Sequence, residues 1–206
     1  MAFRGSGVAT ALLLALLVGV MAVVQYARYD PLTDTRPAVN FSQHPTAIVF
    51  HALGASFAPL IGLLQWSTRL RKRWPAVHRW LGRFYVMICV LIGGMAGLWL
   101  SFFAYGGPLV RIGLNIVGVL WLFTTWKAYA AIRAGRVSEH RRWMMRSVAL
   151  ALGGVTLRAY LPILVISSVP FLTAYRIVAW ASWVPNLLIA EYLLYRERQG
   201  RLRPSR

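Results

Sequence analysis

Acidic residues and cysteine are both scarce in this chain of 206 residues. Five Asp and Glu face 23 Lys and Arg, which gives a formal net charge of +18. Charged residues make up only 14% of the sequence, whereas a soluble domain carries about 25%. The single cysteine, Cys89, excludes a disulfide or a multi-thiol metal site within one chain. These shortages argue against a soluble enzyme, a disordered tail and a disulfide scaffold.

Long apolar runs take the place of the missing charge, since 58% of the residues are hydrophobic. Each run is about 20 residues long, the length that crosses a bilayer as a helix. The first run is longer than the apolar region of a cleaved signal peptide. We therefore predict an all-α, polytopic helical bundle, one integral membrane domain over residues 1–206. Its six spans are expected at residues 8–26, 47–66, 81–105, 109–130, 147–169 and 177–195.

The basic residues predict the orientation of these spans. Cytoplasmic loops of membrane proteins are enriched in Lys and Arg, and here the cations flank the same ends of the spans. Both termini are therefore expected in the cytoplasm of a bacterial cell, with the spans in its inner membrane. This distribution also argues against nucleic acid as the partner, which would need the cations on one folded face. The cations assigned to the cytoplasmic side are Arg4, Arg69, Arg71, Lys72, Arg73, Arg79, Arg83, Lys127, Arg133, Arg136, Arg141, Arg142, Arg146, Arg196, Arg198, Arg201, Arg203 and Arg206.

Polar residues within the outer half of the spans form one candidate ligand site. Ionisable groups in a bilayer are costly and mark functional positions by default. At about 1.5 Å per residue, His51, Asn115 and Arg158 all fall about 9–12 Å from the outer face. They are expected to share one level and to bind a ligand such as a quinone, with Pro162 breaking the fifth span nearby. The alternative is a hydrogen-bonded structural core.

A second candidate site lies at the cytoplasmic ends of the spans. His78 and His140 each open a span in a similar basic-aromatic string, which suggests a duplicated hairpin or a chance similarity. Two histidines from two helices are the minimum for axial ligation of haem b, and Arg83 and Arg146 could hold its propionates. The alternative is that these groups bind lipid phosphate at the membrane edge. Glu191 is expected to form a structural ion pair with Lys127 or Arg196.

Four strings carry a resemblance to a known family. They are His51, the Gly-Leu-Leu-Gln at 62–65, the His-Arg-Trp-Leu-Gly-Arg at 78–83 and the His-Arg-Arg-Trp-Met-Met-Arg at 140–146. This pattern resembles the bacterial predicted membrane proteins of domain-of-unknown-function family 2306, which implies no established activity. The third string, at residues 78–83, is also similar to the haem-ligating stretch of transmembrane b-type cytochromes and ferric reductases. That similarity implies an axial-ligand role for His78.

Two functions from different classes follow. The first is a membrane redox component that binds one haem b at His78 and His140, or a quinone near His51 and Arg158. The second is a non-enzymatic membrane protein, either an assembly subunit or a module that binds a small ligand or lipid. No ligand spacing indicates a metal centre. Catalytic activity, a membrane-protein partner and a homo-oligomer all stay open at this point.

Overall fold

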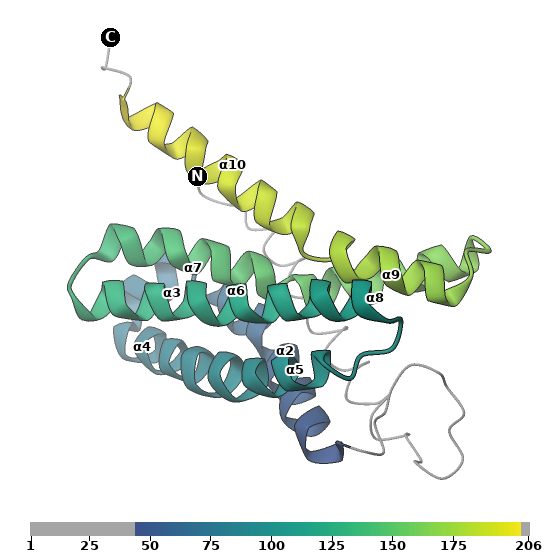
Figure 1. Cartoon of the computed structure of the whole chain (residues 1–206). Coiled ribbons are helices and arrows are strands. Elements are labelled where there is room, and N and C mark those ends of the chain that lie inside the picture. Colours follow the sequence, from purple (N-terminus) through teal and green to yellow (C-terminus); the bar gives the residue numbers. More distant parts are fainter. Residues whose placement is uncertain (1–43, 203–206) are drawn as a thin grey trace.

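The computed structural model describes residues 44–202, and these form helices joined by short turns (Figure 1). The predicted first span, residues 8–26, lies outside this range. Proline occupies the first turn of α2, α4 and α6, where a missing backbone N–H costs nothing. The elements are α2 (Pro45–Leu64), α3 (Thr68–Arg73), α4 (Pro75–Phe84), η2 (Tyr85–Ile92), α5 (Gly93–Ser101), α6 (Pro108–Arg133), α7 (Val137–Ala151), α8 (Gly153–Ile166), α9 (Phe171–Ala181) and α10 (Val184–Leu202).

Five helical segments are long and apolar enough to cross a membrane, and each overlaps one of the predicted spans. They are Pro45–Leu64, Pro75–Ser101, Pro108–Arg133, Val137–Ile166 and Phe171–Gly200. The prediction of an all-α bundle is therefore confirmed for the residues described. The third and fifth segments of the predicted set begin earlier than expected, because Pro75 and Val137 start helices inside the basic loops.

Four of the spans form a closed ring of neighbours. The helix α2 packs against η2 and α5, α5 packs against α6, α6 packs against α7, and α7 packs back against α2 (Figure 1). The third span, which contains α4, η2 and α5, is thus diagonally opposite α7 across the bundle. Both of these segments run away from the basic end, so they are parallel. Residues at equal heights on them can face each other.

Small residues allow the closest helix contact. A Cβ atom added to Gly54 in α2 would lie 2.7 Å from the Cα of Gly93 and 2.9 Å from the carbonyl oxygen of Cys89. Both obstacles are backbone atoms, so no side chain can move aside. Glycine is required at this crossing, as the spacing of small residues in the spans predicts.

Two irregularities interrupt the spans. Residues 85–92 form a π-helix, η2, in the third span, and such stretches are frequent at functional sites. The fifth predicted span is interrupted at Leu152, between α7 and α8. Our expectation that Pro162 breaks this span is wrong, because α8 continues through Pro162 to Ile166.

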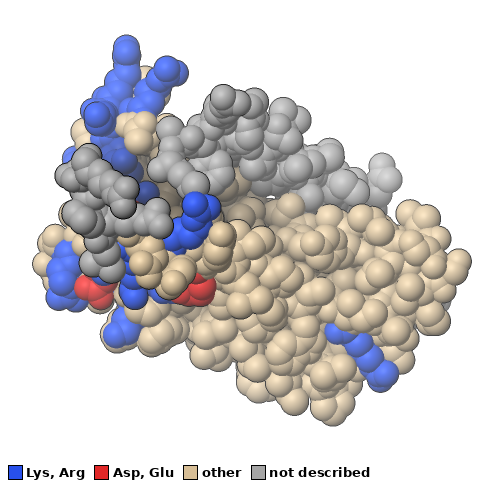
Figure 2. Space-filling view, turned by 90° about the horizontal axis from the view of Figure 1, so that it is seen from above, with Lys and Arg blue, Asp and Glu red and all other residues tan. Residues whose placement is uncertain are grey.

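Charged side chains gather at one end of the bundle, as Figure 2 shows. The α3–α4 segment, the α6–α7 turn and the end of α10 lie together there (Figure 1). At the opposite end, Arg111 donates to the Ala104 carbonyl and Arg176 donates to the Gly106 carbonyl. This basic end is the one that the positive-inside rule predicts for the cytoplasmic side.

Candidate functional site

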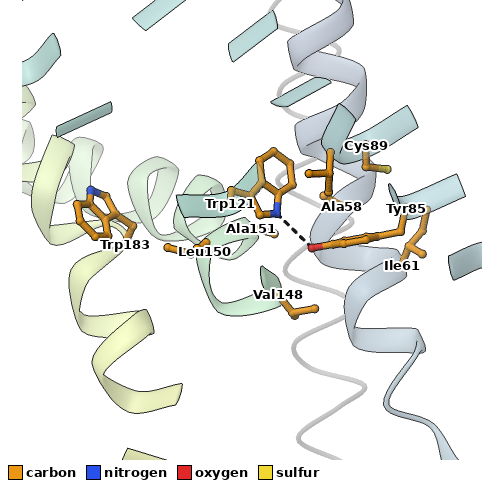
Figure 3. Packing of buried hydrophobic residues seen from close by; sticks show 10 residues of the cluster. Ala58, Ile61, Tyr85, Cys89, Trp121, Val148, Leu150, Ala151 and Trp183 are labelled. Atoms are coloured by element: carbon orange, nitrogen blue, oxygen red, sulfur yellow. Dashed lines mark hydrogen bonds between the residues drawn. The ribbon is translucent and has the colours of Figure 1, made fainter. Parts of the chain in front are cut away.

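A ring of hydrogen bonds lies at the centre of the four-span bundle. The Tyr85 hydroxyl is 2.8 Å from the Ser147 hydroxyl, which is 2.6 Å from the Thr125 hydroxyl. The Trp121 indole N–H donates to the Tyr85 oxygen at 3.2 Å, the contact drawn in Figure 3. Tyr85 and Ser147 are both 0% exposed. The ring joins η2, α6 and α7 inside an apolar cluster that includes Ala58.

The direction of each bond in the ring follows from proton counting. The Thr125 hydroxyl donates to the Trp121 carbonyl at 2.8 Å, so it can only accept from Ser147. Ser147 has then spent its one proton and must accept from Tyr85. The chain therefore runs from the Trp121 N–H through three hydroxyls back to the Trp121 carbonyl. Each hydroxyl donates once and accepts once, so the ring is a satisfied structural connection.

The two candidate haem ligands lie two helical turns from this ring, towards the basic end of the bundle. His78 precedes Tyr85 by seven residues, and His140 precedes Ser147 by seven. Seven residues bring a helix back to nearly the same face and span about 10.5 Å. Because Tyr85 and Ser147 meet, His78 and His140 lie at equal heights on the two helices. They are close enough to interact electrostatically.

The ring nitrogens of the two histidines differ in their partners. The Nδ1 of His140 lies 2.9 Å from the Ala128 carbonyl, and since a carbonyl only accepts, this nitrogen carries the proton. The Nε2 of neutral His140 then holds the lone pair. The Nδ1 of His78 is buried and has no hydrogen-bond partner among the described residues. Arg71 and Arg79 also act electrostatically on the His78 side chain.

The two arginines expected to hold propionates are engaged elsewhere. Arg146 forms a two-bond ion pair with Glu191 on α10, at 2.5 and 2.8 Å. The guanidinium of Arg83, an exposed residue, lies 5.0 Å from the centre of the Trp80 ring. Our expectation that Glu191 pairs with Lys127 or Arg196 is wrong in the partner, although the ion pair itself is present. The depth count along single helices could not show that α7 packs beside α10.

His51 and Arg158, the two ionisable residues of the outer candidate site, are brought together from α2 and α8. Arg158 acts electrostatically on His51 and also donates to the Gly154 carbonyl at 3.1 Å. The Nδ1 of His51 lies 3.0 Å from the Gly93 carbonyl and must donate to it. A Cβ atom at Gly97 would lie 2.4 Å from this nitrogen. The His51 imidazole is thus held against Gly93 and Gly97 of α5.

Neither Asn115, which was expected at this level, nor Asn186 of α10 has a hydrogen bond to His51 or Arg158 among the described residues. The Asn115 side chain donates to the Arg111 carbonyl at 2.8 Å. Both residues belong to α6, so this bond joins no other helix. The Asn186 side chain donates to the Thr156 hydroxyl at 3.0 Å and links α10 to α8. Thr156 precedes Arg158 by two residues. Side chains two residues apart lie on different faces of a helix, so the link between Asn186 and Thr156 is separate from the outer polar cluster of His51 and Arg158.

Sequence reasoning missed the hydrogen-bond ring. Tyr85 and Ser147 carry no motif of their own, and Thr125 and Trp121 read as ordinary residues of an apolar span. A signal was nevertheless present, because Tyr85 and Ser147 occupy equivalent places seven residues after the two histidines. The suggested repeat between these segments therefore corresponds to two helices at one height that face each other.

The arrangement of spans agrees with a comparison against known families. The family described as predicted membrane protein, DUF2306, matches residues 48–194. The chain belongs to this family. The matched region runs from α2 to the middle of α10 and includes His51, His78 and His140. No curated protein and no solved structure matches the chain significantly. This member of the family is an integral membrane protein whose helices contact the bilayer.

Proposed function

We propose that this protein is a membrane redox component that binds one haem b between His78 and His140. The observation that carries the proposal is the equal height of His78 and His140 on diagonally opposite spans, where they interact electrostatically. The Tyr85–Ser147 bond two turns away sets their relative height. Bis-histidine ligation needs two such side chains from different helices.

The side chains around His78 and His140 are suited to holding haem b. The Ala128 carbonyl would orient the His140 ring and leave its Nε2 towards the iron, the usual outer-shell arrangement for a ligating histidine. Arg71 and Arg79 would neutralise the propionates in place of Arg83 and Arg146. A bound haem would supply reversible one-electron transfer.

An absorption spectrum of the purified protein, before and after dithionite, tests the proposal. We expect a Soret band that shifts on reduction and a sharp α band. His78→Ala and His140→Ala should each remove at least about nine-tenths of the band, because one axial ligand no longer holds the iron. His44→Ala is the matched control, since His44 lies at the outer end of α2 against Phe103, and it should keep the full band.

A colourless protein from haem-replete cells would contradict this assignment. If a histidine variant merely misfolds, His78→Gly and His140→Gly with added imidazole separate the two causes. Free imidazole restores ligation in a folded protein but does not restore a lost fold. Retention of the band in both alanine variants would also overturn the proposal.

A quinone site at the outer cluster is the second candidate. The electrostatic coupling of Arg158 to His51 favours it, because the guanidinium can donate to a quinone carbonyl. The Nε2 of His51, whose Nδ1 donates to the Gly93 carbonyl, can accept from a quinol hydroxyl. We expect a water-soluble quinone such as duroquinone to raise the midpoint of thermal unfolding by a few degrees, and Arg158→Gln to remove this shift. Asn115→Ala should leave the shift unchanged. An equal shift in Arg158→Gln would contradict the assignment.

A further inference from the structure

The basic residues of α3 lack acidic partners within the described part of the chain. Residues 35–138 contain no Asp or Glu. The carboxylates of Glu139, Glu191 and Glu197 pair with Arg136, Arg146 and Arg141, respectively. These ion pairs all lie on the α7 and α10 side of the bundle. The positive charge of α3 therefore needs a counter-charge from outside these residues.

Three cations of α3 share one face of the helix. Arg69, Lys72 and Arg73 are spaced at i, i+3 and i+4, which brings them within one sector of a helical turn. All three side chains are exposed, whereas Leu70 faces inward. Arg71 lies on a different face and acts on His78. Like charges at this spacing repel each other, so an anion bound between them would stabilise α3.

The position of α3 between two spans indicates that its anion is a lipid headgroup. The helix lies between two membrane-spanning segments, Pro45–Leu64 and Pro75–Ser101, so it is at the depth of lipid headgroups. Trp74 and Trp80 are 55% and 68% exposed beside it, and tryptophan prefers this interfacial zone. The Arg73 guanidinium lies 5.9 Å from the centre of the Trp74 ring. A headgroup phosphate could contact the cations while its acyl chains run along α4.

We propose that the face of α3 formed by Arg69, Lys72 and Arg73, with Trp74, binds the phosphate of an anionic phospholipid. This site is separate from the haem site and does not depend on it. It differs from a general attraction to a negative surface, because it assigns the lipid to one helix. The remaining cytoplasmic cations provide the comparison that separates the two.

The test titrates phosphatidylglycerol into the full-length protein in neutral detergent and counts retained lipid by native mass spectrometry. The site variant is Arg69→Gln/Lys72→Gln/Arg73→Gln. The control is Arg133→Gln/Arg196→Gln/Arg198→Gln, which removes the same charge elsewhere at the cytoplasmic end. We expect the site variant to retain phosphatidylglycerol about 100-fold more weakly, because each basic residue near an anionic surface contributes about five-fold. The control should retain it as the wild type does.

Several outcomes would overturn the proposal. Equal losses in the two triple variants would show general surface attraction, and equal retention of phosphatidylcholine would show that the phosphate charge is not recognised. Displacement of the lipid by millimolar inorganic phosphate would indicate a soluble anion as the occupant. If the site variant does not fold, Lys72→Gln alone should still weaken retention about five-fold, and unchanged retention in that variant would refute the site.

Discussion

Replacing Gly54 with alanine is expected to lower the free energy of unfolding by about 3 kcal/mol, a value typical of strong overpacking. The added Cβ would lie 2.7 Å from the Cα of Gly93 and 2.9 Å from the Cys89 carbonyl oxygen. Relief requires α2 to move away from η2 and α5. Unfolding in mixed micelles with increasing dodecyl sulfate, followed by circular dichroism, measures the change.

Gly82→Ala is the matched control for this substitution. A Cβ at Gly82 would meet nothing within 4 Å, although Gly82 also lies inside a helix. We expect it to be neutral or to stabilise by up to about 1 kcal/mol, the difference in helix propensity between the two residues. Equal effects of the two substitutions would show that the α2–α5 crossing is not as close as described. Because His51 rests on the same face of α5, Gly54→Ala should also disturb the outer polar cluster.

Tyr85→Phe is expected to lower the free energy of unfolding by about 2 kcal/mol, within the range for leaving buried polar groups unpaired. The substitution removes one oxygen and leaves the Trp121 N–H without its acceptor and Ser147 without its donor. The aromatic ring remains, so no large cavity forms. A mutant cycle with Ser147→Ala measures the coupling, and we expect the double variant to cost less than the sum of the single ones.

Tyr195→Phe controls for loss of a tyrosine hydroxyl at an exposed position, since Tyr195 is 59% exposed. It should change the free energy of unfolding by less than about 0.5 kcal/mol. Additive effects of Tyr85→Phe and Ser147→Ala would contradict the closed ring. The haem band offers a further distinction, because Tyr85 lies about 10.5 Å along the helix from His78. The folded Tyr85→Phe protein should therefore retain the band that His78→Ala loses.

The candidate sites show which features depend on neighbouring helices. A duplicated hairpin would place His78 and His140 at one height, and the contact between Tyr85 and Ser147, each seven residues further on, is consistent with that arrangement. The arginines were harder to assign, because a guanidinium can reach several partners from one helix position. Arg146 could have approached a propionate, but α10 lies beside α7 and places Glu191 against it. The Asn115 side chain, expected in the outer site, bonds instead to the Arg111 carbonyl of its own helix.

The sequence by itself determined that the chain is a bundle of membrane-spanning helices, where the five described spans lie and which end is basic. These features depend on the length of apolar runs and on charge beside them, which are local properties of the chain. Only the tertiary structure decided the partner of Glu191, the interruption at Leu152, the π-helix at Tyr85–Ile92 and the buried ring around Ser147. Each of these depends on which helix faces meet, because a buried polar group takes the partner that packing brings within about 3 Å.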